Sequence, residues 1–135
     1  MHNLAIALRG LFEQFGRIND LNESIQLERA AFTILDAKQD PDRSMAMDGL
    51  SLSLSMRSKL TGNSRDAEEA VVASRAAVAA SPVGSNLRPA YLNSLANRLT
   101  SRFRLYKDRH DLDAAIEAAS QAVTASAGDL SLIHI

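Results

Sequence analysis

The sequence predicts an all-α protein, and three observations lead to this fold class. Alanine and leucine dominate the 135 residues, whereas aromatic residues make up 4% of the chain and tryptophan is absent, a composition typical of helices. The hydrophobic fraction of 46% and the charged fraction of 23% are ordinary for a globular domain and exclude a disordered or collagen-like chain. The third observation is an internal repeat, which is a signature of helical arrays.

The repeat aligns three segments without internal gaps. They begin at Leu4, Leu50 and Leu95, at intervals of 46 and 45 residues. Identical residues recur in the same register: leucines one helical turn later (Leu8, Leu54, Leu99), aspartates (Asp20, Asp66, Asp111) and alanines (Ala31, Ala77, Ala122). Apolar and small residues recur at helical spacing on either side of each aspartate. We therefore expect about three antiparallel helical hairpins in a single domain that covers residues 1–135.

The first hairpin is predicted within residues 1–41. Its first helix ends near Phe15, because Gly16 is a typical helix stop. Its second helix begins at Asp20, whose carboxylate we expect to cap the amides of the first turn. The breaker Asp40-Pro41-Asp42 then ends this hairpin.

The second hairpin is predicted within residues 42–87. Its first helix ends near Thr61, before Gly62, and its second helix begins at the capping residue Asp66. The segment Ser51–Met56 alternates with period two, which taken alone would indicate a strand. The repeat register overrules that interpretation, and we expect a helix here. We also expect it to be the weakest helix, because its serines compete for backbone hydrogen bonds.

The third hairpin is predicted within residues 88–130. The breaker Ser81-Pro82-Val83-Gly84 separates it from the second hairpin. Its first helix ends near Tyr106, where Lys107 replaces the glycine of the other two repeats. Its second helix begins at Asp111, which completes the pattern of six helices.

Charge and composition exclude several classes of partner. The net charge is −1 and the isoelectric point is near 6.3, whereas nucleic-acid-binding domains are usually strongly basic. The absence of cysteine excludes disulfides, cysteine-bound zinc and thiol catalysis. No apolar run is long enough for a membrane helix, and residues 4–8 are too short for the apolar core of a signal peptide. We expect an intracellular, cytoplasmic protein without a nucleic-acid or membrane partner.

No set of residues in the sequence predicts catalysis. The three histidines, His2, His110 and His134, lie at the two termini and in a predicted loop, so no pair shares a helical face. Gly-rich phosphate loops and nucleophile motifs are also absent. We therefore expect no catalytic residue, no cofactor and no metal, and an enzyme is the least favoured class.

A run of basic residues in the third repeat has two interpretations. Arg98, Arg102, Arg104, Lys107 and Arg109 could bind phosphate or nucleic acid, with Phe103 and Tyr106 as stacking partners. Both aromatic residues, however, fall on predicted core positions that they share with Phe12 and Phe15. An ordinary solvated helix face is the favoured interpretation.

The recurring motifs resemble those of the tetratricopeptide-repeat (TPR) superfamily. The resemblance is carried by Leu95-Ala96-x-x-Leu99, by residues 111–117 (Asp-Leu-Asp-Ala-Ala-Ile-Glu), by Asn3–Leu8 and by Pro41-Asp42-Arg43-Ser44. It is strongest for the long-period arrays of fungal multidomain proteins, which often accompany an NTPase module or a CHAT protease domain. The period alone would equally allow HEAT or armadillo repeats.

This resemblance implies a right-handed α-solenoid whose first helices line a concave groove that binds a peptide or protein. The expected function is therefore a non-enzymatic protein–protein interaction module. By register, the groove is lined by first-helix positions that avoid the core, and its candidate binding residues are Arg9, Asp48, Ser55, Asn93, Asn97 and Thr100. Asn93 and Asn97 lie one turn apart and could hydrogen-bond an extended peptide backbone.

The alternative function is structural, as a segment of a longer array that acts as a spacer or a self-association surface. The motivation is the two ends of the sequence. The chain opens three residues before Leu4, and it closes with an apolar tail over residues 130–135 without a polar capping helix, the last five residues (131–135) lying beyond the third repeat. Uncapped ends expose apolar surface, which favours stacking on another chain.

Overall fold

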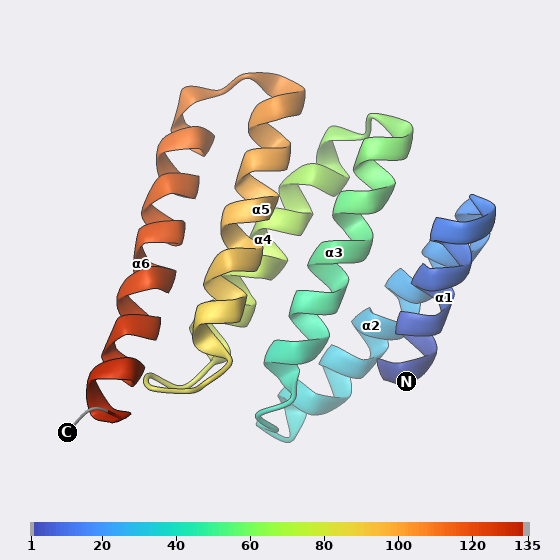
Figure 1. Ribbon diagram of the computed structural model, residues 1–135. Helices are drawn as coiled ribbons and strands as arrows, with labels where there is room; N and C mark the ends of the chain where they lie inside the picture. Colours follow the sequence, from blue (N-terminus) through green and yellow to red (C-terminus); the bar gives the residue numbers. More distant parts are fainter. Residues whose placement is uncertain (1, 134–135) are drawn as a thin grey trace.

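Six α-helices joined by short loops make up the described chain (Figure 1). The structure is a computed structural model that describes the backbone of residues 2–133 and the side chains of residues 3–126. The helices are α1 (His2–Phe15), α2 (Ile18–Ala37), α3 (Arg43–Thr61), α4 (Ser64–Ala80), α5 (Arg88–Tyr106) and α6 (Arg109–Ile133). No strand occurs in this part of the chain, so the predicted all-α class is confirmed. The side chains of His2, His134 and the predicted apolar tail lie outside the described residues.

The helices form three hairpins, and each helix packs against the next one along the chain (Figure 1). The first helices of the hairpins also contact one another, since α3 lies against both α1 and α5. The backbones of the second helices, α2, α4 and α6, do not approach one another in this way within the described residues, although the side chains of Arg29 on α2 and Glu69 on α4 form an ion pair. We call the continuous layer of α1, α3 and α5 the first-helix layer. Helices α1 and α6 occupy the two opposite ends of the array (Figure 1).

The core lies between the first-helix layer and the second helices. Leu54 and Leu99 are fully buried, and burial of a leucine side chain contributes about 1.5–3 kcal/mol. Two clusters account for most of this core: Leu21, Ile25, Leu50, Leu54, Ala70 and Ala73, and then Val71, Leu95, Leu99, Ala115 and Ala118. The leucines and small residues that recur in the sequence are therefore the residues that hold neighbouring helices together.

The turn between the two helices of each hairpin begins with a left-handed residue. Gly16 and Gly62 have φ angles of 70° and 75°, so the two predicted glycine helix stops are confirmed. Lys107 adopts the same conformation, with φ of 62°, and its amide donates to the carbonyl of Phe103 at 2.7 Å. This conformation is unfavourable by about 1–2 kcal/mol for a residue with a Cβ atom. The third hairpin thus has the same turn as the first two, without the glycine.

The prediction that Asp20, Asp66 and Asp111 cap the second helices is wrong. Each aspartate is the third residue of its helix, because α2, α4 and α6 begin two residues earlier than expected. Asn63 caps α4 instead, and its side chain accepts hydrogen bonds from the amides of Arg65 and Asp66.

Two of the aspartates form ion pairs with the preceding helix. Arg57 donates two hydrogen bonds to Asp66, both at 2.8 Å, and Arg102 donates two to Asp111, at 2.9 and 2.6 Å. Both carboxylates are buried and both pairs span nine residues, so the same ion pair ties together the second and the third hairpin. In the first hairpin Leu11 occupies the position of these arginines in the repeat register, and Asp20 accepts from Arg17 at 3.1 Å.

The prediction of core aromatics at Phe15 and Tyr106 is also wrong. Their exposed fractions are 59% and 43%, because both are the last residues of their helices, where the chain turns away from the core. Phe103 is half-buried. The neighbouring basic run is only partly a solvated face: Arg104 is exposed, whereas Arg102 is engaged by Asp111.

Candidate functional site

The six predicted binding residues differ in exposure along the first-helix layer. Arg9 and Ser55 are buried, Asp48 and Thr100 are half-buried, and Asn93 and Asn97 are exposed. Asn93 and Asn97 lie one turn apart on α5, and their amide groups have no hydrogen-bond partner among the described residues. The two asparagines therefore lie on an open surface, whereas Arg9 and Ser55 are buried between packed helices.

Arg9 belongs to a buried polar cluster that connects α1, α2 and α3. Its guanidinium forms an ion pair with Glu28, which is 2% exposed. The hydroxyls of Ser24 and Ser53 each donate to Glu28 Oε1 at 3.0 Å, and Arg9 Nη1 donates to Ser53 Oγ at 3.2 Å. Ser24 lies on the face where the sequence predicts packing, but no motif or spacing in the sequence singles out Glu28. Satisfied polar groups in a low-dielectric interior fix the register of the helices that carry them.

Gly49 makes room for this cluster. A Cβ atom at residue 49 would lie 1.9 Å from Glu28 Oε2, closer than any real contact allows. The carbonyl of Gly49 also accepts from Arg9 Nη1 at 3.5 Å. A glycine in a helix interior is unfavourable by about 0.5–1 kcal/mol relative to alanine, and here the close approach of the Glu28 carboxylate explains its presence.

A second group of charges lies between α3 and α5. Burial raises the pKa of the Asp48 carboxyl, while a hydrogen bond from Ser94 and the nearby guanidinium groups of Arg98 and Arg9 act in the opposite direction. Burial also lowers the pKa of Arg98, which Asp48 partly offsets. Positive and negative groups thus alternate from α1 through α3 to α5.

The replacement Asp48→Asn is expected to stabilise the protein at pH 7. Because the pKa of Asp48 is raised in the folded state, that state binds the proton more tightly than the unfolded state does. The ionised carboxylate therefore lowers the free energy of unfolding above this pKa, and the penalty disappears as the pH falls through it. Urea titrations between pH 7 and pH 4 should show a stabilising difference that shrinks with acidification. Asp113→Asn, at an exposed carboxylate, serves as the control, and a destabilised Asp48→Asn protein at pH 7 would contradict the account.

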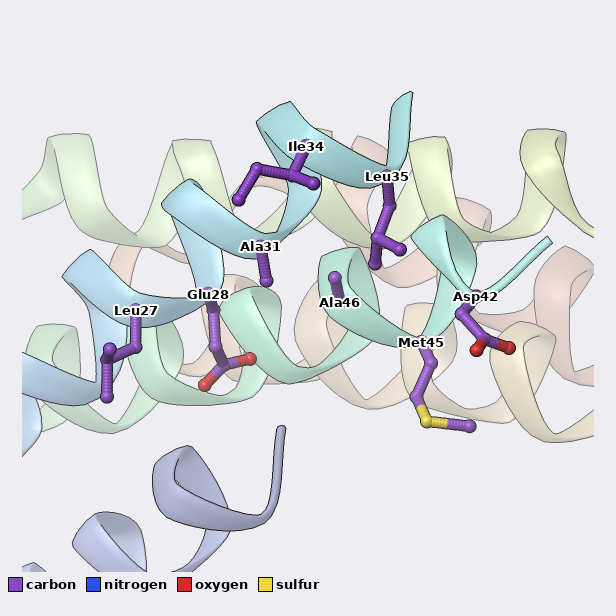
Figure 2. A pocket seen from close by; sticks show the side chains of 8 residues that line it. All are labelled: Leu27, Glu28, Ala31, Ile34, Leu35, Asp42, Met45 and Ala46. Atoms are coloured by element: carbon purple, nitrogen blue, oxygen red, sulfur yellow. The ribbon is translucent and has the colours of Figure 1, made fainter. Parts of the chain in front are cut away.

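A pocket of about 220 Å³ lies between α2 and α3 (Figure 2). Figure 2 shows Glu28 and Asp42 toward its opposite ends, with apolar side chains from both helices between them. The apolar lining consists of Leu27, Ala31, Ile34, Leu35, Met45 and Ala46. Met45 lies three residues before Asp48, so the pocket adjoins the first-helix layer. The sequence did not predict this pocket, because its walls come from two helices whose separation is set by tertiary packing.

Neither a metal-binding group nor a membrane-spanning helix is found among the described residues. Among the described residues, no group of three or more histidine, cysteine, aspartate or glutamate side chains is arranged to hold a metal ion. None of the described helices combines the length and the apolar character that crossing a membrane requires.

Comparison with known proteins finds no matching protein family, no matching curated protein and no matching solved structure.

Proposed function

We propose that the chain is a non-enzymatic interaction module that binds a peptide or protein through the first-helix layer. The proposal includes the finer architecture that the repeat implies: a right-handed α-solenoid of the TPR type with a period of 45–46 residues, whose first helices line the concave face. The observation that supports it best is the packing of α3 against both α1 and α5, while the backbones of the second helices lie farther apart within the described residues and α2 reaches α4 only through long side chains such as those of Arg29 and Glu69. Closer packing on one side of an array makes that side the concave one.

Two features of the layer suit a peptide. The free amides of Asn93 and Asn97 present donors and acceptors one turn apart, which match the backbone groups of an extended segment. The pocket beside Met45 has the size and apolar lining that an aliphatic side chain of the ligand would fill. The pocket would thus hold an apolar side chain of the peptide, and the two asparagines would hydrogen-bond to its backbone.

The charges of the layer also limit the kind of ligand. Arg9 is neutralised by Glu28, and Asp48 lies beside Arg98, so these groups compensate one another inside the protein. Charged groups that are compensated within the protein in this way do not select ligands by long-range attraction. We expect recognition at the two asparagines and the pocket by hydrogen bonds and apolar contact.

Selection from a displayed library of random peptides tests this proposal. Peptides enriched on the wild-type protein should lose about tenfold or more in affinity on Asn97→Ala or Ile34→Glu, which remove one amide and one pocket wall. The matched controls are Asn86→Ala and Val83→Glu, in the exposed loop between the second and third hairpins. Isothermal titration calorimetry gives the affinities. Peptides whose binding is insensitive to both site variants, or a library without any enriched peptide, would contradict the proposed site.

A further inference from the structure

The two end helices of the array each expose an apolar stripe. On α6, Ile116 and Val123 have exposed fractions of 59% and 69%, and on α1, Leu4 and Leu11 have exposed fractions of 50% and 37%. An exposed alanine lies in the middle of each stripe, Ala119 on α6 and Ala7 on α1. In both helices the three residues follow the spacing i, i+3, i+7, which places them on one face.

The internal junctions between hairpins show what such faces do when they are covered. At the α2–α3 junction, Ile25 packs in one cluster with Leu50. At the α4–α5 junction, Val71 packs in one cluster with Leu95. Each junction therefore joins a β-branched residue of a second helix to a leucine of the next first helix.

The exposed stripes contain the two halves of this same junction. In the repeat register Ile116 occupies the position of Ile25 and Val71, and Leu4 occupies the position of Leu50 and Leu95. Helix α6 thus carries the β-branched half of a junction, and α1 carries the leucine half. Because the halves lie at opposite ends of the array, one copy cannot join them by itself (Figure 1).

The centre of the stripes differs from the internal junctions in a way that favours contact. Between α2 and α3 the central position holds Glu28, which accepts from Ser53 at 3.0 Å. Between α4 and α5 it holds Ser74 and Arg98. The corresponding residues of the exposed stripes are Ala119 and Ala7, which need no hydrogen-bond partner when they become buried.

We propose that the α6 stripe of one copy packs on the α1 stripe of a second copy, head to tail, with Ile116 of one copy against Leu4 of the next. This inference does not rest on the proposed peptide site. The contact uses different surfaces on the two copies, so it leaves a free stripe at each end of a dimer and can continue into longer chains. We expect it to be weaker than an internal junction, because Leu11 stands where Arg57 donates to Asn22 at 3.0 Å.

Sedimentation equilibrium on the full chain and on single-charge variants tests the contact. The weight-average mass of the wild-type protein should rise beyond that of a dimer over a range of about 5–500 µM. Leu4→Glu and Ile116→Glu should each remain monomeric, because each blocks one of the two stripes. Val83→Glu, in a loop where the side chain is 92% exposed, is the control and should associate like the wild type.

Mixing the two blocked variants distinguishes head-to-tail contact from every symmetric one. Ile116→Glu keeps an intact α1 stripe and Leu4→Glu keeps an intact α6 stripe, so an equimolar mixture should form a dimer and nothing larger. Formation of this dimer also shows that both variants are folded. A wild-type protein that stays monomeric over the whole range, or a mixture that stays monomeric, would overturn the inference. Leu4→Glu that still associates on its own would overturn it as well, because that result points to α6 packing on α6.

Discussion

Replacement of Arg9 by methionine is expected to lower the free energy of unfolding by about 3–5 kcal/mol. The substitution keeps much of the side-chain volume but leaves the Glu28 carboxylate in the interior without its ion-pair partner. Ser24 and Ser53 still donate to this carboxylate, but hydroxyl groups do not neutralise its charge. Urea denaturation followed by circular dichroism at 222 nm, on wild-type and variant proteins at pH 7, measures the loss.

Two companion variants separate the buried pair from a surface pair. Arg29→Met removes an ion pair with Glu69 whose side chains are 48% and 37% exposed, and it should cost less than about 1 kcal/mol. The double variant Arg9→Met with Glu28→Leu should recover most of the stability lost by Arg9→Met alone, since no buried charge remains. Equal losses for Arg9→Met and Arg29→Met would show that the cluster is not buried as the structure has it.

The replacement Gly49→Ala is expected to destabilise the protein by about 2–4 kcal/mol, although alanine is the better helix former. The new methyl group would occupy the place of the Glu28 carboxylate, 1.9 Å from Oε2, and would force it away from Arg9 and Ser53. Gly10→Ala is the matched control, because Gly10 lies in α1 where an added Cβ atom would meet no other atom within 4 Å. Alanine at residue 10 should raise the stability by about 0.5–1 kcal/mol.

The sign of the Gly49→Ala effect should depend on residue 28. In a Glu28→Ala background the obstructing carboxylate is gone, so Gly49→Ala should become neutral or stabilising. A double-mutant cycle measured by urea denaturation yields this coupling directly. Additive effects of the two substitutions would contradict the close approach of residues 28 and 49.

The helical class and the core leucines could be predicted from the sequence because they depend on local periodicity. Leu54 and Leu99 occupy the same position in successive repeats, and the apolar residues of each repeat follow helical spacing. Apolar residues with this pattern lie in the core where neighbouring helices pack. The same register correctly overruled the strand-like alternation around Ser53. Serine and leucine alternate in this segment because α3 has neighbouring helices on more than one side. On one of these sides the Ser53 hydroxyl contacts Ser24 and Glu28.

The roles of the charged residues could not be predicted from periodicity. An aspartate near the start of a helix can be either a capping residue or an ion-pair residue. For Asp66, only the position of Arg57 in space shows that it forms an ion pair. By register Arg9 is predicted to line the groove, yet its ion pair with Glu28, 19 residues later, holds its side chain in the interior. These outcomes depend on pairs of residues that come together only after neighbouring helices pack.

NMR chemical-shift mapping with a peptide from the library selection shows whether the first-helix layer is the binding surface. Titration of ¹⁵N-labelled protein should shift the amide signals of Met45, Asn93 and Asn97 and of their neighbours on α3 and α5. Signals from the opposite side, such as those of Val72 on α4 and Glu117 on α6, should stay in place. Shifts confined to the second helices, with the first-helix layer unchanged, would show that the peptide does not bind to this layer.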